Sequence, residues 1–273
     1  METAFYEQVD ADSYVATPAT IGPWSADAQH GGPPSALAAR AIERHEPDPR
    51  QRLARVSVDI LRPVPIGKIS IKTRTVRPGR RVTLVEAVLE ADGHEVMHAR
   101  GWRIERQDGH VPEIEEGDRP VWLPPPGVGS APDIFTRHQH GYLTMIEWRF
   151  NADDYDIAGQ VPDGRQARVR SAWTRARIPL LAGEETSPMS RTLLVADSGS
   201  GVSAALPVAE YTFVNVDLTV ISQRDPAGEW LLLEASTVIG ADGTGLASTR
   251  LSDKQGSFGR GLQTLIVAPI TRR

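Results

Sequence analysis

Hydrophobic and polar residues along this chain follow two spacings, one typical of helices and one typical of strands. Over residues 187–206 the apolar positions form a compact helical run that starts with Ser187 and Pro188. Serine caps helix starts well, and proline suits the first helical position. Gly199 and Gly201 are expected to stop the run. The pattern predicts a buried helix.

A second apolar helix is expected over residues 35–44, directly after Gly31, Gly32 and two prolines. Alanine, leucine and isoleucine cover most of its surface, and the two glycines allow a backbone or a ligand to approach closely. A helix that is apolar on nearly all sides must be covered by other elements. We therefore expect a sheet to wrap around it.

Alternating apolar and polar residues predict that sheet in the segment that follows. Turn sequences of the Pro-Ile-Gly, Arg-Pro-Gly and Ala-Asp-Gly type separate the runs, which indicates antiparallel hairpins. The alternating runs cover residues 56–60, 69–75, 82–88 and 96–104.

Periodicity is absent between residues 108 and 140, a segment rich in prolines and turn formers. A connection of this length exceeds most loops inside a compact domain. We expect two units, residues 1–107 and 141–273, joined by a proline-rich linker at 108–140. Two further strands, 145–150 and 167–178, precede the buried helix of the second unit.

Two short sequences recur after that helix. Val-Ser-Val-Asp-Ile at 56–60 returns as Val-Asn-Val-Asp-Leu at 214–218, and Ala-Asp-Gly at 91–93 returns at 241–243. Both copies follow a helix and accompany a long apolar strand. This order indicates an internal duplication.

Composition excludes several classes of function. The net charge is -5 and the basic residues are scattered singly, so no basic field for nucleic acid or an anionic membrane is expected. No apolar run reaches the roughly 18 residues that cross a bilayer, and the first residues lack signal-peptide features, so we expect a cytoplasmic protein. The absence of cysteine excludes disulfides, thiolate metal sites and a cysteine nucleophile.

His94 and His98 match the H-E-x-x-H pattern of zinc proteases. That pattern needs a helix, whereas this segment follows an Ala-Asp-Gly turn and alternates like a strand. On a strand, four residues span about 13 Å, too far for two histidines to bind one zinc ion. We expect no metal here and no cofactor.

Asp197 is the first candidate for chemistry. It lies in the last turn of the predicted helix, at the negative end of the helix dipole, and shares a face with apolar Leu193. Both effects disfavour the ionised carboxylate, and desolvated carboxylates commonly serve as general bases. The alternative is an exposed acid at a frayed helix end.

Several motifs, in this order and spacing, resemble the acyl-CoA thioesterase II family. They are Gln-His-Gly-Gly at 29–32, Leu-Arg-Pro at 61–63, Thr-Val-Arg-Pro-Gly at 75–79, Val-Ala-Asp at 195–197, Glu-Trp-Leu-Leu at 229–232 and Ala-Ser-Thr at 247–249. The resemblance implies an α+β double hotdog, with two antiparallel sheets that each wrap a long apolar helix. Exposed edges of such sheets are usually paired, so we expect a homodimer or higher homo-oligomer.

The resemblance also implies hydrolysis of fatty acyl-CoA thioesters by an Asp, a Thr and a Gln that position one water. The Asp falls on Asp197, the Thr on Asn215 and the Gln on Leu251, which cannot form the hydrogen bond. Gln255 or Gln263 could substitute, and the sequence does not decide between them.

The expected reaction therefore uses Asp197 as general base, with Asn215 orienting the water. Backbone N–H groups that follow Gly31 and Gly32 would stabilise the oxyanion, and we place His30, Gly31 and Gly32 in the substrate site. A serine hydrolase is excluded because no G-x-S-x-G motif occurs.

The alternative function is a non-catalytic protein that binds acyl-CoA or an acyl chain. Leu251, in place of the family's glutamine, is its main argument.

Overall fold

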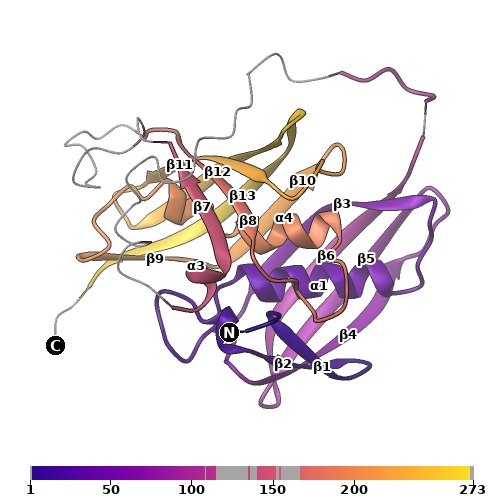
Figure 1. Cartoon of the computed structure of the whole chain (residues 1–273), viewed down its shortest axis with the longest axis horizontal. Coiled ribbons are helices and arrows are strands. Elements are labelled where there is room, and N and C mark those ends of the chain that lie inside the picture. Colours follow the sequence, from indigo (N-terminus) through magenta and orange to yellow (C-terminus); the bar gives the residue numbers. More distant parts are fainter. Residues whose placement is uncertain are drawn as a thin grey trace.

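The strands of this protein form one antiparallel sheet that runs through the whole molecule (Figure 1). A computed structural model describes residues 2–107, 109–114, 135, 140–151, 154 and 167–270. Within this part the sheet has 13 strands, twelve of them in the order β1-β2-β4-β5-β6-β3-β10-β13-β12-β11-β8-β7, while β9 pairs with β13.

The first half contributes six strands, one helix and a short 3₁₀ turn. The elements are β1 (Tyr6–Asp10), β2 (Ser13–Ala16), η1 (Pro18–Thr20), α1 (Gly32–Arg44), β3 (Gln51–Ile60), β4 (Lys68–Arg77), β5 (Val82–Ala91) and β6 (His94–Glu105). The four alternating runs of the sequence correspond to β3–β6, so this prediction is confirmed. The hairpin of β1 and β2 was not predicted, because four of the five β1 residues are exposed and give no alternation.

The described ranges from Gly141 onward contribute seven strands and three helices. They are α3 (Tyr142–Met145), β7 (Ile146–Phe150), β8 (Arg170–Ala176), α4 (Pro188–Ala196), α5 (Gly199–Val202), β9 (Tyr211–Asn215), β10 (Asp217–Ser222), β11 (Leu231–Ile239), β12 (Thr244–Asp253) and β13 (Gly256–Pro269). Most of the predicted linker at 108–140 lies outside the described residues. No helix in the described ranges has the length and apolar character needed to span a membrane.

The two halves repeat the same strand order. Outward from β3 the neighbours are β6, β5, β4, β2 and β1, and outward from β10 they are β13, β12, β11, β8 and β7. The sheet order therefore supports the duplication, but one of the two sequence matches was misaligned. The Ala-Asp-Gly turn at 91–93 joins β5 to β6, whereas the one at 241–243 joins β11 to β12, which corresponds to the turn between β4 and β5.

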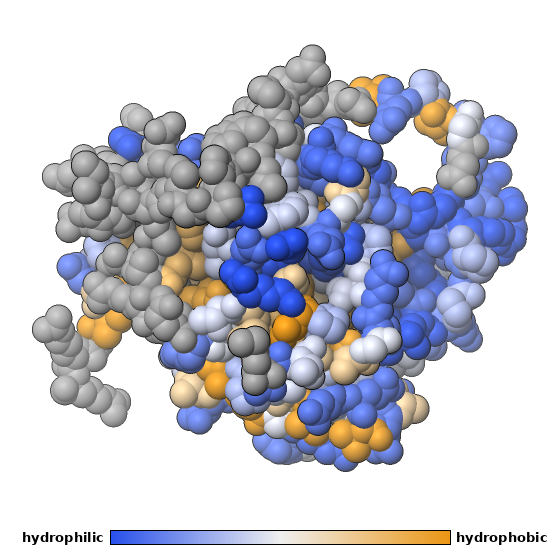
Figure 2. Space-filling model, viewed as in Figure 1, coloured by the Kyte–Doolittle hydropathy of each residue, from blue (hydrophilic) through white to orange (hydrophobic). Residues whose placement is uncertain are grey.

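The halves join at their central strands. β3 and β10 pair antiparallel from Asp59 opposite Asp217 to Arg55 opposite Ile221. The described strands therefore form one continuous sheet, where two separate sheets were expected. Hydrophilic residues predominate over the first-half strands, at the right of Figure 2, and apolar residues such as Val56 and Val58 face the core.

Helix α1 packs against β3–β6 and against α4. It starts at Gly32 with prolines in its first turn, and ten of its residues are buried, as the apolar pattern predicts. Figure 1 shows α1 and α4 side by side in front of the sheet. They run antiparallel, because the start of α1 at Gly32 meets the end of α4 at Leu194 and Ser187, before α4, meets Glu43 near the end of α1.

The start of α4 agrees with the prediction and its end does not. The Ser187 hydroxyl accepts a hydrogen bond from the N–H of Ser190, and Pro188 opens the helix. The helix ends at Ala196, and the short α5 starts at Gly199. A side chain at Gly199 would lie 2.3 Å from the Thr249 hydroxyl, so this glycine permits the close approach of α5 to β12.

Candidate active site

Asp197 lies directly after the last residue of α4 and is 5 % exposed. The alternative of an exposed acid at a frayed helix end is therefore wrong. The carboxylate opposes the negative end of α4 but faces the start of α1, because a Cβ atom built at Gly31 would lie 2.8 Å from Oδ2. The positive end of the α1 dipole offsets the unfavourable position on α4.

Two side-chain amides hold this carboxylate. Asn215, the last residue of β9, donates from Nδ2 to Oδ1 of Asp197 at 2.8 Å. Gln263 on β13 donates from Nε2 to the main-chain oxygen of Asp197 at 2.9 Å and lies 3.3 Å from Oδ1. The Gln263 amide is itself oriented, because its Oε1 accepts a hydrogen bond from the N–H of Ser200 at 3.1 Å.

His30 approaches the other carboxylate oxygen. Its Nδ1 lies 3.1 Å from Oδ2 of Asp197 and also 3.1 Å from the N–H of Gly32. One nitrogen cannot donate to the carboxylate and accept from an N–H at the same time. Protonated Nδ1 therefore donates to ionised Asp197, and unprotonated Nδ1 accepts from Gly32. Burial lowers the pKa of His30, and the charge of Asp197 opposes this by raising it.

The expected oxyanion donors need correction. Pro33 follows Gly32 and has no N–H, and the N–H of Gly32 points to Nδ1 of His30. The N–H of Gly31, at the start of α1, forms no hydrogen bond within the described residues. It is the remaining candidate donor at this end of the helix.

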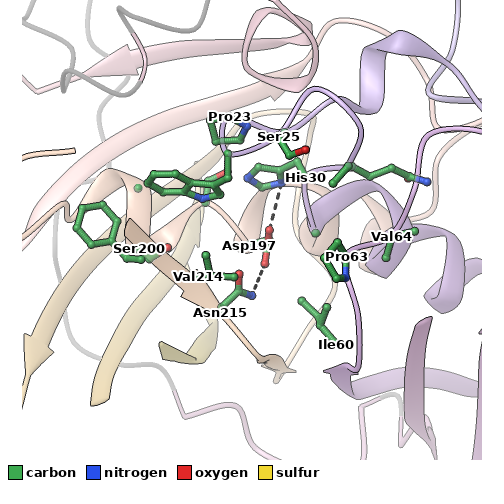
Figure 3. A pocket seen from close by; sticks show the side chains of 18 of the residues that line it. Pro23, Ser25, His30, Ile60, Pro63, Val64, Asp197, Ser200, Val214 and Asn215 are labelled. Carbon is green, nitrogen blue, oxygen red and sulfur yellow. Dashed lines mark hydrogen bonds and ion pairs between the residues drawn. The ribbon is translucent and has the colours of Figure 1, made fainter. Parts of the chain in front are cut away.

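A cavity of about 330 Å³ lies against these residues, and side chains of both halves line it (Figure 3). His30, Gly31, Asp197 and Asn215 belong to its wall, whereas Gly32 does not. The remainder of the wall is mainly apolar and includes Trp24, Ile60, Pro63, Met97, Leu143 and Phe213. In Figure 3 Asp197 lies between His30 and Asn215, with Ile60 and Pro63 on one side and Ser200 and Val214 on the other.

Leu251 does not belong to the site. It is fully buried in the hydrophobic core, on β12 opposite Gly259 of β13. Gln255 lies in the turn between these strands, where its N–H donates to Asp253. Of the three positions weighed for the glutamine, the structure brings only Gln263 to Asp197.

An aromatic side chain also contacts His30. Tyr142, which the sequence did not single out, stacks on the ring of His30 with centroids 3.7 Å apart.

His94 and His98 lie on β6, as predicted, and His98 pairs with Glu95 at 2.9 Å. The part of the chain that the structure describes has no group of three His, Cys, Asp or Glu residues placed to hold a metal ion.

Family models match most of the chain. Residues 20–104 match the acyl-CoA thioesterase N-terminal domain, and residues 119–267 match the acyl-CoA thioesterase C-terminal domain. No curated protein sequence matches the chain.

Several solved structures share the fold over nearly the whole chain. A candidate thioesterase II from Thermobifida fusca has a TM-score of 0.75 at 20 % identity and covers 97 % of this chain and 96 % of its own. A protein of unknown function with a hotdog fold from Alicyclobacillus acidocaldarius has a TM-score of 0.69 at 16 % identity, again over 97 % and 96 %. An acyl-CoA thioesterase II from Mycobacterium marinum gives 0.67 at 17 %, with the same coverage.

These likenesses show a hotdog fold, and the two matching domains together cover more than half of the sequence. Both the expected family and the expected class of enzyme are confirmed. The chain belongs to the acyl-CoA thioesterase family of thioester hydrolases.

Proposed function

We propose that this protein hydrolyses the thioester bond of a fatty acyl-CoA, with Asp197 as the general base. The observation that carries the proposal is a buried carboxylate, held by the amides of Asn215 and Gln263, at the wall of a mainly apolar cavity. Apolar walls suit an acyl chain, and the carboxylate at the wall is placed to take a proton from water.

The reaction starts when a water molecule beside Asp197 attacks the thioester carbonyl carbon and gives one proton to the carboxylate. A carbon–oxygen bond forms, and the carbonyl oxygen becomes an oxyanion that the N–H of Gly31 stabilises. The carbon–sulfur bond then breaks, and the proton passes from Asp197 to the sulfur. The products are a carboxylic acid and free CoA.

The neighbouring side chains orient these groups. Asn215 and Gln263 both donate to Oδ1, so they fix the plane of the carboxylate. A fixed carboxylate limits the positions that the attacking water can occupy. His30 contacts Oδ2 through Nδ1. When Nδ1 carries the proton of the ring, it donates to Oδ2 and helps to hold the carboxylate in place.

The alternative of a non-catalytic acyl-CoA binding protein depended on Leu251. Because Leu251 lies in the core and Gln263 supplies an amide to Asp197, that argument no longer favours binding alone.

Release of free CoA from acyl-CoA substrates of different chain lengths tests the proposal. Asp197→Ala should lower the rate by about 10² to 10⁴, the usual cost of removing a general base. Asp197→Asn is the matched variant, because it keeps the size of the side chain and removes its basicity. Since the chain has no cysteine, a thiol-reactive dye reports only released CoA. Turnover that survives in both variants would exclude Asp197 as the base.

We also propose that the two halves are duplicated hotdog units and that the protein assembles as a homodimer or higher homo-oligomer in the cytoplasm. Strands β1 and β7 end the main path of the sheet, and unpaired edges of this kind favour association. Light scattering at micromolar concentration tests the assembly, and a monomer mass would contradict it.

A further inference from the structure

Tyr142 contacts both sides of the candidate site although it lies on a separate element, the short helix α3. It is fully buried. Its ring lies on the imidazole of His30, with 3.7 Å between centroids and 10° between planes. Its hydroxyl donates to the main-chain oxygen of Leu194 at 2.8 Å and lies 2.9 Å from Oγ of Ser198.

The hydroxyl of Tyr142 fixes the end of α4. In a continuing α-helix the oxygen of Leu194 would accept from the N–H of Ser198, but that N–H donates to Val195 instead. Tyr142 supplies the missing donor. Asp197 is the residue between this end of the helix and Ser198, so the phenol holds the turn that carries the carboxylate.

The backbone around Tyr142 is also fixed. Its N–H donates to the oxygen of Ile21 at 3.0 Å. Gly141 has a φ of 61°, and a Cβ atom there would lie 2.4 Å from the same oxygen. A glycine is therefore required for α3 to reach the loop that leads to His30.

We propose that Tyr142 is a positioning residue that sets the separation between His30 and Asp197. Its ring fixes the plane of the imidazole, and its hydroxyl fixes the helix end that bears the carboxylate. The inference rests on the proposed function, because the distance between these two groups matters for the transfer of the proton from water.

The ring also takes part in the burial of His30. Among the described residues, two titratable groups contact the imidazole: Asp197 from the end of α4 and the phenol of Tyr142 from α3. Burial raises the pKa of Tyr142, so the phenol stays neutral. Removing the ring admits water to one face of the imidazole and relieves the desolvation that lowers the pKa of His30.

Two variants separate the roles of ring and hydroxyl. Tyr142→Phe keeps the stacked ring and removes the hydroxyl, whereas Tyr142→Leu removes both. Tyr14→Phe is the matched control, because Tyr14 is also buried and its hydroxyl bonds Arg40, which lies outside the cavity wall. The measurements are kcat and KM for an acyl-CoA, and the titration of His30 followed by NMR.

For Tyr142→Phe we expect kcat to fall about tenfold, the loss that corresponds to one positioning hydrogen bond, with KM unchanged. For Tyr142→Leu we expect a larger fall in kcat and a rise of about one pH unit in the midpoint of His30. Tyr14→Phe should change neither quantity.

Unchanged kcat in Tyr142→Phe, or a His30 midpoint in Tyr142→Leu equal to that of the unsubstituted protein, would overturn the inference. If Tyr142→Leu does not fold, kcat of Tyr142→Phe decides. If the unsubstituted protein releases no CoA, the proposed function fails, and the His30 midpoint in Tyr142→Leu still tests the positioning role.

Discussion

Gln263 donates to the main-chain oxygen of Asp197 and lies 3.3 Å from its carboxylate, although the two residues are 66 positions apart in the sequence. The amide thus holds both the turn and the side chain of the proposed base. Gln263 is 2 % exposed, and the N–H of Ser200 fixes its orientation. A residue held in this way can contribute to rate without touching the acyl chain.

Replacing Gln263 by methionine keeps the length of the side chain and removes its donor. We expect kcat to fall by about 10- to 100-fold, because one hydrogen bond to a charged group contributes about 1.5–3 kcal/mol. KM should change little. Steady-state kinetics with one acyl-CoA measure both constants, and a kcat equal to that of the unsubstituted protein would remove Gln263 from the mechanism.

Leu251→Gln introduces a glutamine at the position where the family resemblance predicts one. Because Leu251 is fully buried in the core, the variant should gain no activity. It should instead lose about 1–3 kcal/mol of stability through a buried amide without partners. Urea denaturation measures this loss, and increased turnover by Leu251→Gln would show that the wrong glutamine has been assigned.

Glu43 makes the stability of the protein depend on pH. Burial raises the pKa of this carboxyl from 4.5 to about 7, although the hydrogen bond from the Ser187 hydroxyl at 2.6 Å opposes the shift. The folded protein therefore binds a proton that the unfolded chain has already lost between about pH 4.5 and 7. Stability from this group is fully present below that window and is lost as the pH rises through it.

Glu43→Gln mimics the protonated carboxyl and keeps an acceptor for Ser187. At about pH 4.5 the variant should be nearly as stable as the unsubstituted protein, and at pH 8 it should be more stable by about 2–3 kcal/mol. Denaturation curves at both pH values give the difference, in which the other titrating groups cancel. Equal stabilities at pH 8 would contradict the raised pKa of Glu43.

Arg62 is an exposed cation at the cavity wall, and none of the ion pairs found in the described ranges includes it. We expect it to attract the phosphates of CoA. Arg62→Ala should raise KM for an acyl-CoA by about three- to tenfold and leave kcat unchanged, as for a partly screened charge contact. A thioester of N-acetylcysteamine, which has no phosphate, should show no such change.

The matched control is Arg81→Ala, another exposed arginine that lies outside the cavity wall. An equal rise in KM for both substrates, or for both variants, would show that Arg62 does not recognise the phosphates.

Local sequence singled out the carboxylate of the candidate site but not all of the residues that contact it. Asp197 was identified because an acid at an apolar helix end is unfavourable by itself, and the structure places it with His30, Gly31 and Asn215. Gln263 was one of two glutamines considered, with Gln255, because strand β13 was not recognised.

The reason lies in the glycines of β13, which interrupt the alternating pattern. Gly259 is needed because a Cβ atom there would lie 2.4 Å from the oxygen of Ile221 on β10. Tyr142 gave no sequence signal at all, since its role depends on a contact with a residue more than a hundred positions away. Packing between distant elements is what a single sequence reveals least well.

The misaligned repeat has a similarly physical cause. Asp92 and Gly93 both adopt positive φ angles, of 50° and 77°, and Gly243 has one of 84°. Asp-Gly is favoured in any tight hairpin of this kind. The same dipeptide therefore recurs at two hairpins that are not equivalent in the duplicated order.

The antiparallel pair of α1 and α4 has a consequence for the proposed duplication. At each end of the pair, an acidic residue near the C-terminus of one helix lies beside the N-terminus of the other helix. Asp197 lies beside Gly31, and Glu43 lies beside Ser187. In a dimer of identical units, a substitution alters both ends together. Within a single chain each end changes independently. Among the described residues, the Asp197 end has two amides and a mainly apolar cavity, whereas charged side chains such as Arg40 and Glu184 line the cavity at the Glu43 end. Under the proposed duplication, one half can keep the chemistry while the other half changes freely. Titration with a tight-binding acyl-CoA analogue should then saturate at one equivalent per chain.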